Sequence, residues 1–234
     1  LKLCALTLAH RGFPSLPPWG EMPRQRGWTA ACLAAGSSRY GSKWYWVRRY
    51  KLDDSPQEWY GLSFRELRRF IDPVFGLGHP ILDVGCGTSR FAEDARSAGY
   101  KSMVAVDFCS SLVERLRLQN PHVRYLSTDI TDLTGLAACS FGGGFDKGTM
   151  DGLMGEFSPE DVVRAQSAVR AIHRILWPGC FWVSVSVSDP DNFRECVLST
   201  DSIDLQLEST SCLPVNLEHA GPTEAYVHLF QKKK

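Results

Sequence analysis

Residues 81–89 read ILDVGCGTS, and this stretch decides the fold class of the 234-residue chain. Its first four residues form a short, mostly apolar run that predicts a buried strand. The residues beyond the turn predict a helix over 89–98. Gly85 and Gly87 suit a tight turn between the two, because a backbone without side chains can approach a ligand closely. The free N–H groups at the start of the helix would face that ligand.

Strands and helices alternate along the rest of the chain. Further strands are predicted at 102–106, 123–126, 181–187, 204–207 and 225–230. Helices are predicted to begin at Ser63, at Ser110 or Ser111, and at Ser158. Alternation of this kind predicts a doubly wound α/β fold, in which helices cover both faces of a parallel sheet.

Two acids end successive predicted strands. Asp107 lies where a carboxylate accepts hydrogen bonds from the ribose hydroxyls of an adenosine-containing cofactor, although it could instead cap the next helix. Asp129 lies where a carboxylate can reach an adenine amino group. The alternative for Asp129 is an Asx turn within residues 128–132, and Asp132 is the weaker cofactor candidate of the two.

The identity of the cofactor depends on one position. Nicotinamide dinucleotides and S-adenosylmethionine both use this arrangement of a glycine turn and a strand-end acid. The dinucleotide fingerprint requires a third glycine or alanine, and the corresponding residue here is Arg90. S-adenosylmethionine has no pyrophosphate and makes no such demand, so the pattern favours a methyltransferase over a nicotinamide dehydrogenase.

Several motifs resemble those of one family. Residues 81–89 look like motif I of the seven-strand S-adenosylmethionine-dependent methyltransferases, and LWPG at 176–179 resembles their helix-to-strand turn. FDKGTMD at 145–151 resembles the D-K-G-T-[LM]-D element of the lysine methyltransferases that modify elongation factor 1-alpha and mitochondrial citrate synthase. YWVRRY at 45–50 and EWY at 58–60 resemble the lead-in of that group.

The resemblance implies a fold, a cofactor and a substrate. It implies a mostly parallel, seven-stranded Rossmann-like sheet with an antiparallel terminal strand, S-adenosylmethionine as the cofactor, and a lysine of another protein as methyl acceptor. The implied cofactor residues are Tyr45, Arg49, Asp83, Gly85, Gly87, Asp107, Phe108, Asp129, Ile130 and Asp146. Within that set, Arg49 would pair with the methionine carboxylate, and Asp146 would also be catalytic by orienting or deprotonating the amine. Trp59 and Lys147 would contact the substrate.

Each of these roles has a structural alternative. Asp146 could hold its loop, and Lys147 could be a solvated or paired charge. Aromatic clusters are more often packing than binding sites, and we expect Trp46 and Tyr50 to be structural. Trp59 stays open between packing and a cation–π contact with an ammonium group.

The chain departs from the resemblance at Gly142, Gly143 and Gly144, where the family carries an aspartate and two β-branched residues. Each glycine inside a strand costs about 0.5–1 kcal/mol. We therefore expect neighbours to fill the space, or the protein to be marginally stable, or the chain to be a degenerate relative.

Composition limits the partners. Lys+Arg and Asp+Glu both number 26, so the formal charge is zero and offers no electrostatic footprint for nucleic acid or membrane, and we expect neither as a partner. No apolar run approaches the length of a bilayer span. The 8 cysteines form no C-x-x-C pair, so we expect no metal site and no disulfide framework.

Residues 1–43 differ from the rest of the chain, being rich in Arg and Pro and poor in acids. We expect them to be a leader, either disordered or targeting, ahead of one methyltransferase domain at 44–234. This leaves localisation open between the cytosol, which is favoured, and the mitochondrion. A methyltransferase acting on a small molecule and a non-catalytic cofactor-binding relative are the competing functions.

Overall fold

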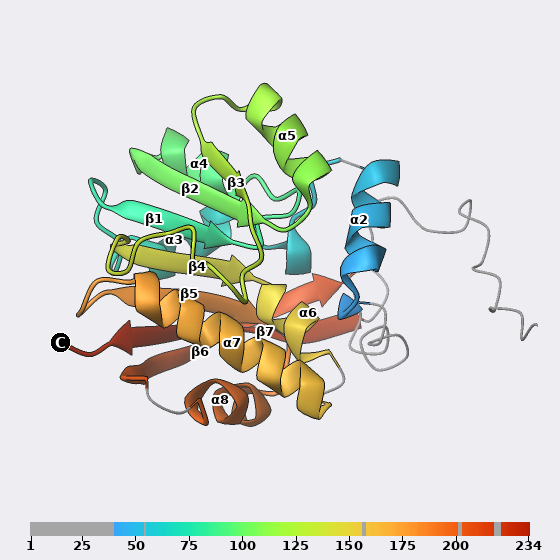
Figure 1. The fold of residues 1–234 in the computed structure, drawn as a ribbon. Coiled ribbons are helices and arrows are strands. Elements are labelled where there is room, and N and C mark those ends of the chain that lie inside the picture. The colour runs from blue at the N-terminus through green and yellow to red at the C-terminus, as the bar shows by residue number, and fades with distance from the viewer. Residues whose placement is uncertain (1–39, 54, 156–157, 201–202, 218–220) are drawn as a thin grey trace, which may run out of the picture.

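The computed structural model describes residues 40–53, 55–155, 158–200, 203–217 and 221–234. Within them the chain forms one seven-stranded sheet in the order β3-β2-β1-β4-β5-β7-β6 (Figure 1). The strands are β1 (Pro80–Val84), β2 (Ser102–Asp107), β3 (Arg124–Ser127), β4 (Gly143–Lys147), β5 (Phe181–Ser186), β6 (Leu205–Leu217) and β7 (Gly221–Lys232). The expected leader at 1–43 lies almost entirely outside the described residues.

Strand direction divides the sheet into two parts. The neighbours from β3 through β5 pair in parallel, whereas β7 pairs antiparallel with both β5 and β6. This topology confirms the predicted doubly wound sheet with an antiparallel end. The last two strands are much longer than predicted, since β6 has 13 residues and β7 has 12.

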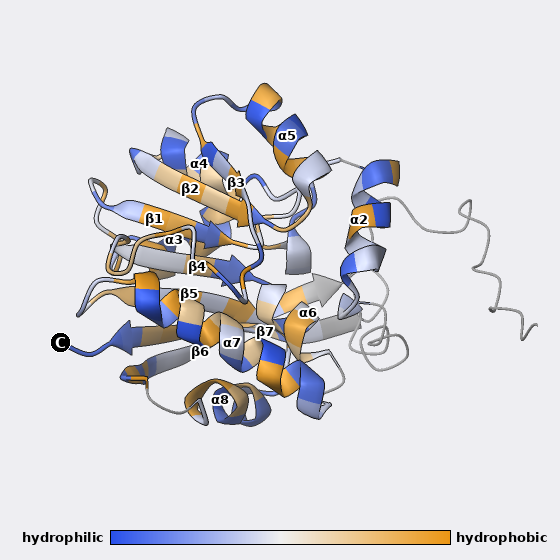
Figure 2. Ribbon diagram, viewed as in Figure 1, coloured by the Kyte–Doolittle hydropathy of each residue, from blue (hydrophilic) through white to orange (hydrophobic). Residues whose placement is uncertain are grey.

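Helices cover both faces of the sheet (Figure 1). They are α2 (Lys43–Leu52), the 3-10 helix η2 (Trp59–Gly61), α3 (Phe64–Ile71), α4 (Phe91–Ser97), α5 (Ser110–Gln119), α6 (Thr149–Met154), α7 (Pro159–Ile175) and α8 (Pro190–Leu198). Successive side chains of β1 point to opposite faces of the sheet. Ile81 belongs to the core cluster formed with α3, α4 and α5, whereas Leu82 and Val84 belong to the cluster formed with α6, α7 and α8. Figure 2 shows orange and blue residues interleaved along α7, as expected for a helix with one buried face.

The predicted helix starts at Ser63 and Ser158 are confirmed. The Ser63 hydroxyl accepts a hydrogen bond from the N–H of Arg65, and the Glu66 carboxylate accepts one from the N–H of Ser63. Ser158 makes the equivalent capping box with Asp161. Each box satisfies N–H groups that the first turn leaves unpaired.

Two neighbours fill the space beside the glycines that precede and begin β4. A Cβ on Gly143 would lie 2.7 Å from the ring of Phe75, and one on Gly142 would lie 2.6 Å from Cβ of His79. Gly144 differs, because its nearest neighbours would be 3.7 Å away, an ordinary contact distance. The expectation that neighbours fill the space is therefore confirmed at the first two glycines.

No helix in the described part of the chain is long and apolar enough to cross a membrane.

Candidate functional site

The pocket of interest lies where the strand order reverses, between β1 and β4. Residues that follow the carboxyl ends of four strands line it: Gly85 after β1, Asp107 and Phe108 at the end of β2, Asp129 to Thr131 after β3, and Lys147 to Thr149 at the end of β4. Ligands of open α/β sheets bind at this kind of reversal. Among the described residues, no group of three His, Cys, Asp or Glu is arranged to hold a metal ion.

The glycine turn leaves no room for side chains. Gly85 has φ +68° and Gly87 has φ +52°, a backbone region that favours glycine. A Cβ on Gly85 would lie 2.4 Å from Oγ1 of Thr149, which donates a hydrogen bond to the Val84 carbonyl at 3.0 Å. A Cβ on Gly87 would lie 2.9 Å from Oη of Tyr50. The turn therefore presents bare backbone to the pocket.

Asp107 is a buried carboxylate at the pocket wall, with 3% of its surface exposed. It accepts hydrogen bonds from the N–H of Gly87 at 3.1 Å and from the N–H of Cys109 at 2.9 Å. Burial raises the pKa of its carboxyl to about 6, although both bonds oppose the shift. Helix α5 has no side-chain cap, because Asp107 bonds the N–H of Cys109, the residue that precedes the helix, and the Asp107 side chain also faces the pocket.

Asp129 also lines the pocket, and its Asx-turn alternative is present as well. One carboxylate oxygen accepts bonds from the N–H and the hydroxyl of Thr131, at 3.0 and 2.9 Å, and the other pairs with Lys43 of α2. Partial burial opposes ionisation, yet the bonds from Lys43 and Thr131 outweigh it and lower the pKa of the carboxyl. Asp132 is exposed, caps the turn at Thr134 and does not line the pocket.

Helix α2 covers one side of the pocket with aromatic rings. Trp46 stacks on Tyr50 at 5.8 Å between ring centroids and meets Trp59 edge-on at 5.7 Å. All three line the pocket. The expectation that Trp46 and Tyr50 are structural is therefore incomplete, because both also face the ligand space. Tyr40, which precedes the expected domain start at residue 44, lines the pocket too.

Tyr45 and Arg49 lie outside the pocket wall. Tyr45 packs edge-on against Tyr40 and Trp46, at 5.1 and 5.2 Å. The Arg49 guanidinium donates to the side-chain carbonyl of Gln57 and lies 5.8 Å from the ring centroid of Trp59. The structure brings neither side chain to a position facing the ligand space.

Asp83 is buried beneath the glycine turn. It is 3% exposed, and its Oδ2 has no hydrogen-bond partner among the described residues. Burial raises the pKa of its carboxyl to about 8, and the nearby Lys147 opposes that shift. A buried acid with an unsatisfied oxygen beside a ligand pocket is uncommon in structural positions.

Asp146 is turned away from the pocket. It has no exposed surface, and its carboxylate accepts bonds from Nε1 of Trp182 at 3.0 Å and from the N–H of Met150 at 3.2 Å. Burial raises the pKa of its carboxyl to about 7. The expectation that Asp146 contacts cofactor and substrate has no support in this geometry, because strand alternation places its side chain on the α7 face. The loop-holding alternative fits instead.

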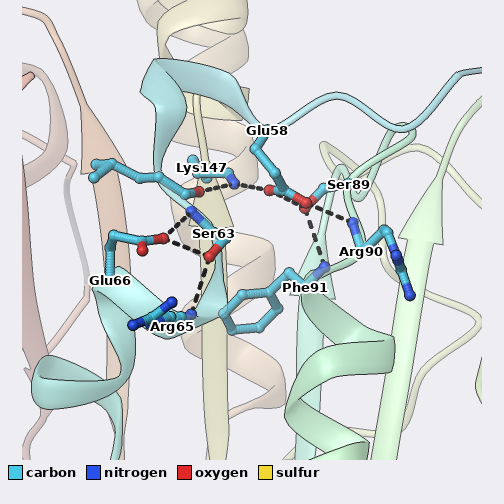
Figure 3. Close-up of polar contacts among 9 residues, drawn as sticks. Glu58, Ser63, Arg65, Glu66, Ser89, Arg90, Phe91 and Lys147 are labelled. Carbon is cyan, nitrogen blue, oxygen red and sulfur yellow. Dashed lines mark hydrogen bonds and ion pairs between the residues drawn. The ribbon is translucent and has the colours of Figure 1, made fainter. Parts of the chain in front are cut away.

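Lys147 is a paired charge. Its ammonium group donates to the Glu58 carboxylate and to the Leu62 carbonyl, and only 2% of its side chain is exposed (Figure 3). The same carboxylate accepts bonds from the Ser89 hydroxyl at 2.9 Å and from the N–H of Arg90 at 2.8 Å. Burial lowers the pKa of Lys147, which Glu58 opposes. The pair ties β4 to the segment around η2 and to the start of α4.

Two pocket residues, Tyr60 and Asp151, had no role in the sequence analysis. The Tyr60 hydroxyl donates to Asp151 at 2.5 Å, and both line the pocket. Both residues stand inside motifs quoted above, EWY and FDKGTMD. No local pattern reveals their contact, because they are 91 positions apart in the chain.

Residues 81–179 match a protein family described as "Methyltransferase domain". Residues 81–179 thus resemble a methyltransferase domain. The chain is 30% identical over 160 residues to EEF1A lysine methyltransferase 4 of Bos taurus, covering 64% of this chain and 62% of that protein. It is 24% identical over 170 residues to the eEF1A lysine and N-terminal methyltransferase of Mus musculus, covering 70% of this chain but only 24% of that protein.

Solved structures share the fold of the methyltransferase domain. A SAM-dependent methyltransferase from Methanosarcina mazei superposes with a TM-score of 0.58 at 13% identity, covering 70% of this chain and 97% of that one. A TehB-like SAM-dependent methyltransferase from Corynebacterium glutamicum gives a TM-score of 0.55 at 21% identity, covering 86% and 100%. At these identities the likeness establishes the class I methyltransferase fold alone.

Proposed function

We propose that the chain is an S-adenosylmethionine-dependent methyltransferase whose acceptor is a lysine side chain of a protein. The pocket carries this proposal: buried Asp107 and the bare Gly85 turn lie side by side at the reversal of a methyltransferase sheet. The names of the similar bovine and mouse proteins support lysine as the acceptor and elongation factor 1A as the first substrate to test. Because the chain spans only part of those proteins, their activities are hypotheses for it.

The residues present fit the cofactor. Asp107 would accept the ribose hydroxyls, and Asp129 with the backbone of Ile130 would hold the adenine. Gly85 and Gly87 would let the methionine part lie against the turn, where a Cβ has no space. The bound cofactor would supply a methyl group on a cationic sulfur.

Two further residues are candidates for the proposed site, and three lie outside the pocket. Phe108 lines the pocket beside Asp107 and would pack against the adenosine. Asp83, with its unsatisfied oxygen beneath Gly85, stays a candidate for the amino group of the methionine part. Tyr45, Arg49 and Asp146 do not line the pocket, and their side chains contact other groups of the protein.

The chemistry requires a neutral amine held in line with the methyl group. A free lysine has a pKa of about 10.4, and a nearby cationic donor favours loss of its proton. Alignment of the two reactants can supply most of the rate. Trp46, Trp59 and Tyr60 form a wall that would exclude water and accept an aliphatic chain.

A labelled-methyl transfer assay tests the proposal. Purified elongation factor 1A and citrate synthase are each incubated with the full chain and labelled S-adenosylmethionine, and the modified residue is located by mass spectrometry. Asp107→Ala should abolish labelling, whereas Asp132→Ala, an exposed acid outside the pocket, should not. Labelled small amines without labelled protein would favour the small-molecule alternative. Cofactor binding with no transfer to any acceptor would favour a non-catalytic relative.

A further inference from the structure

The pocket divides into two halves along the strand order. Gly85, Asp107 and Asp129 follow β1, β2 and β3, on one side of the reversal point. Tyr60 and Asp151 lie on the other side, where β4 and β5 end. If a nucleoside cofactor fills the first half, its reactive end reaches the reversal point between β1 and β4. The methyl acceptor must then enter from the half that holds Tyr60 and Asp151.

Asp151 is fully hydrogen-bonded by donors from two elements. One oxygen accepts from the hydroxyls of Ser186 and Ser188, at 2.5 and 2.6 Å. The other accepts from the N–H of Val187 at 3.2 Å and from the Tyr60 hydroxyl at 2.5 Å. A carboxylate with four donors is fixed in place and acts only as an acceptor. The single hydrogen of the Tyr60 hydroxyl must therefore point at Asp151.

This arrangement gives the Tyr60 oxygen a defined role. With its hydrogen committed to Asp151, the hydroxyl oxygen can only accept further hydrogen bonds. The charge of Asp151 polarises the O–H bond and makes that oxygen a better acceptor. An amine N–H entering this half of the pocket is the kind of donor it would receive.

The backbone around Tyr60 is held in an unusual conformation. Tyr60 has φ +63°, one of the few positive values among the described non-glycine residues. Its hydroxyl lies against Gly148, where a Cβ would be 2.8 Å from Oη. Strained positions of this kind cost about 1–3 kcal/mol and cluster at functional sites.

We propose that Tyr60 binds the acceptor amine and that Asp151 is the positioning residue behind it, an inference that rests on the proposed function. The amine N–H donates to the Tyr60 oxygen, which leaves the nitrogen lone pair directed at the methyl group. The N–C bond forms as the C–S bond breaks, and its electron pair stays on sulfur. The product ammonium then loses one proton to water.

Two substitutions with a matched control test the proposal. Tyr60→Phe removes only the hydroxyl, and Asp151→Asn replaces the acceptor with an amide. The control is Tyr100→Phe, because Tyr100 also donates to a carboxylate, that of Asp72 at 2.9 Å, but lies outside the pocket. The readouts are kcat and KM for the protein acceptor, the cofactor Kd and the melting temperature.

The expected pattern separates binding of the amine from stability. Tyr60→Phe should lower kcat about 100-fold, leave the cofactor Kd within about twofold, and melt like Tyr100→Phe. Asp151→Asn should lower kcat by a smaller factor, because the Val187 N–H keeps the amide oxygen on the Tyr60 side, where the hydroxyl still donates to it but loses the polarising charge. A merely structural role predicts instead that any loss of kcat follows a loss of melting temperature that Tyr100→Phe does not show.

Each contrary result has a distinct meaning. Methyl transfer by the wild type with unchanged kcat in Tyr60→Phe would overturn the inference and leave the proposed function standing. A weakened cofactor Kd in Tyr60→Phe would assign Tyr60 to the donor half instead and would also overturn it. A wild type that binds cofactor but methylates no acceptor would overturn the proposed function, and the inference with it.

Discussion

The ring of Phe75 occupies the space that a side chain on Gly143 would need. A Cβ at position 143 would lie 2.7 Å from two atoms of that ring and 2.9 Å from Cδ1 of Ile81. The glycine is therefore matched to a large neighbour, and the apparent defect in β4 is a packing solution on the α3 side of the sheet. The cost of glycine in a strand is offset by the apolar area that Phe75 buries.

Opposite effects are expected for alanine at adjacent positions of β4. Gly143→Ala should destabilise the protein by about 1–3 kcal/mol, because the added methyl group overpacks against Phe75. Gly144→Ala should stabilise it by about 0.4–1 kcal/mol, since the new Cβ meets neighbours at ordinary distance and the unfolded chain loses freedom. Chemical denaturation of both variants checks this. Equal effects of the two changes would contradict the packing account.

Cofactor affinity should depend on pH through Asp107. Burial raises the pKa of this carboxyl to about 6, and a protonated carboxyl loses acceptor capacity for the ribose hydroxyls. Affinity should therefore be complete above pH 7 and should fall as pH drops through 6, by about tenfold per unit at most. Calorimetric titration from pH 5 to 8 measures it. Asp107→Asn should bind weakly with a flat profile, and Asp132→Asn should follow the wild type.

Stability of the free protein should respond to the same group with the opposite sign. The folded state holds the proton of Asp107 up to about pH 6, whereas an unperturbed carboxyl releases it near 3.8. Raising the pH across this window therefore favours the unfolded state, by up to about 1.4 kcal/mol per pH unit. Asp107→Asn should reduce the slope of this part of the stability profile, while Asp83 and Asp146, whose carboxyls also have raised pKa values, keep the rest of it. An unchanged slope in the variant would show that Asp107 is not the titrating group.

Loss of the Lys147 ammonium should mainly lower the free energy of unfolding, and it should affect catalysis mostly through that loss of stability. Lys147→Met leaves the Glu58 carboxylate without its cation and should cost about 3 kcal/mol, the lower end for buried pairs because Glu58 is 23% exposed. The double variant with Glu58→Gln should lose less than the sum of the two single changes. Additive losses in a double-mutant cycle would mean that the two side chains do not act as a pair.

The pair between Lys43 and Asp129 should compete with the cofactor. Lys43 is 60% exposed, and its ammonium group occupies the carboxylate oxygen that an adenine amino group would use. Lys43→Gln should strengthen cofactor binding by up to about fivefold, since exposed pairs contribute about 0–1 kcal/mol. Lys51→Gln, on the same helix and outside the pocket, should have no effect. Weaker binding in Lys43→Gln would show that Lys43 assists the cofactor.

The half of the pocket that holds Gly85 and Asp107 could be predicted from the sequence, because the place of each residue depends only on its neighbouring strand. Gly85 follows β1 and Asp107 ends β2, and parallel strands bring their carboxyl ends to one edge. Asp146 was assigned to the same edge, but its position one residue before the strand end turns it towards Trp182. Successive side chains of a strand point to opposite faces of the sheet, so a shift of one residue changes the face that a side chain occupies. The sequence does not show which face Asp146 occupies at the end of β4.

The half of the pocket that holds Tyr60 and Asp151 could not be predicted, because its contacts join residues that are far apart in the chain. Nothing local relates Tyr60 to Asp151, and the motif containing Asp151 attracted attention to its first residues instead. Helix α2 also went unpredicted, since its aromatic and basic residues show no apolar period. It forms through packing of Trp46 and Tyr50 over the pocket, which is a tertiary effect.

The contacts of the Glu58 carboxylate bear on the order in which the pocket forms during synthesis. The carboxylate joins Ser89, 31 positions away, and Lys147, 89 positions away. During synthesis the glycine turn and its helix can form as soon as β1 and β2 have emerged, but Lys147 arrives much later. The floor of the pocket is then completed only when β4 pairs with β1. A ribosome-bound chain that stops short of β4 would carry the signature motif without a binding site.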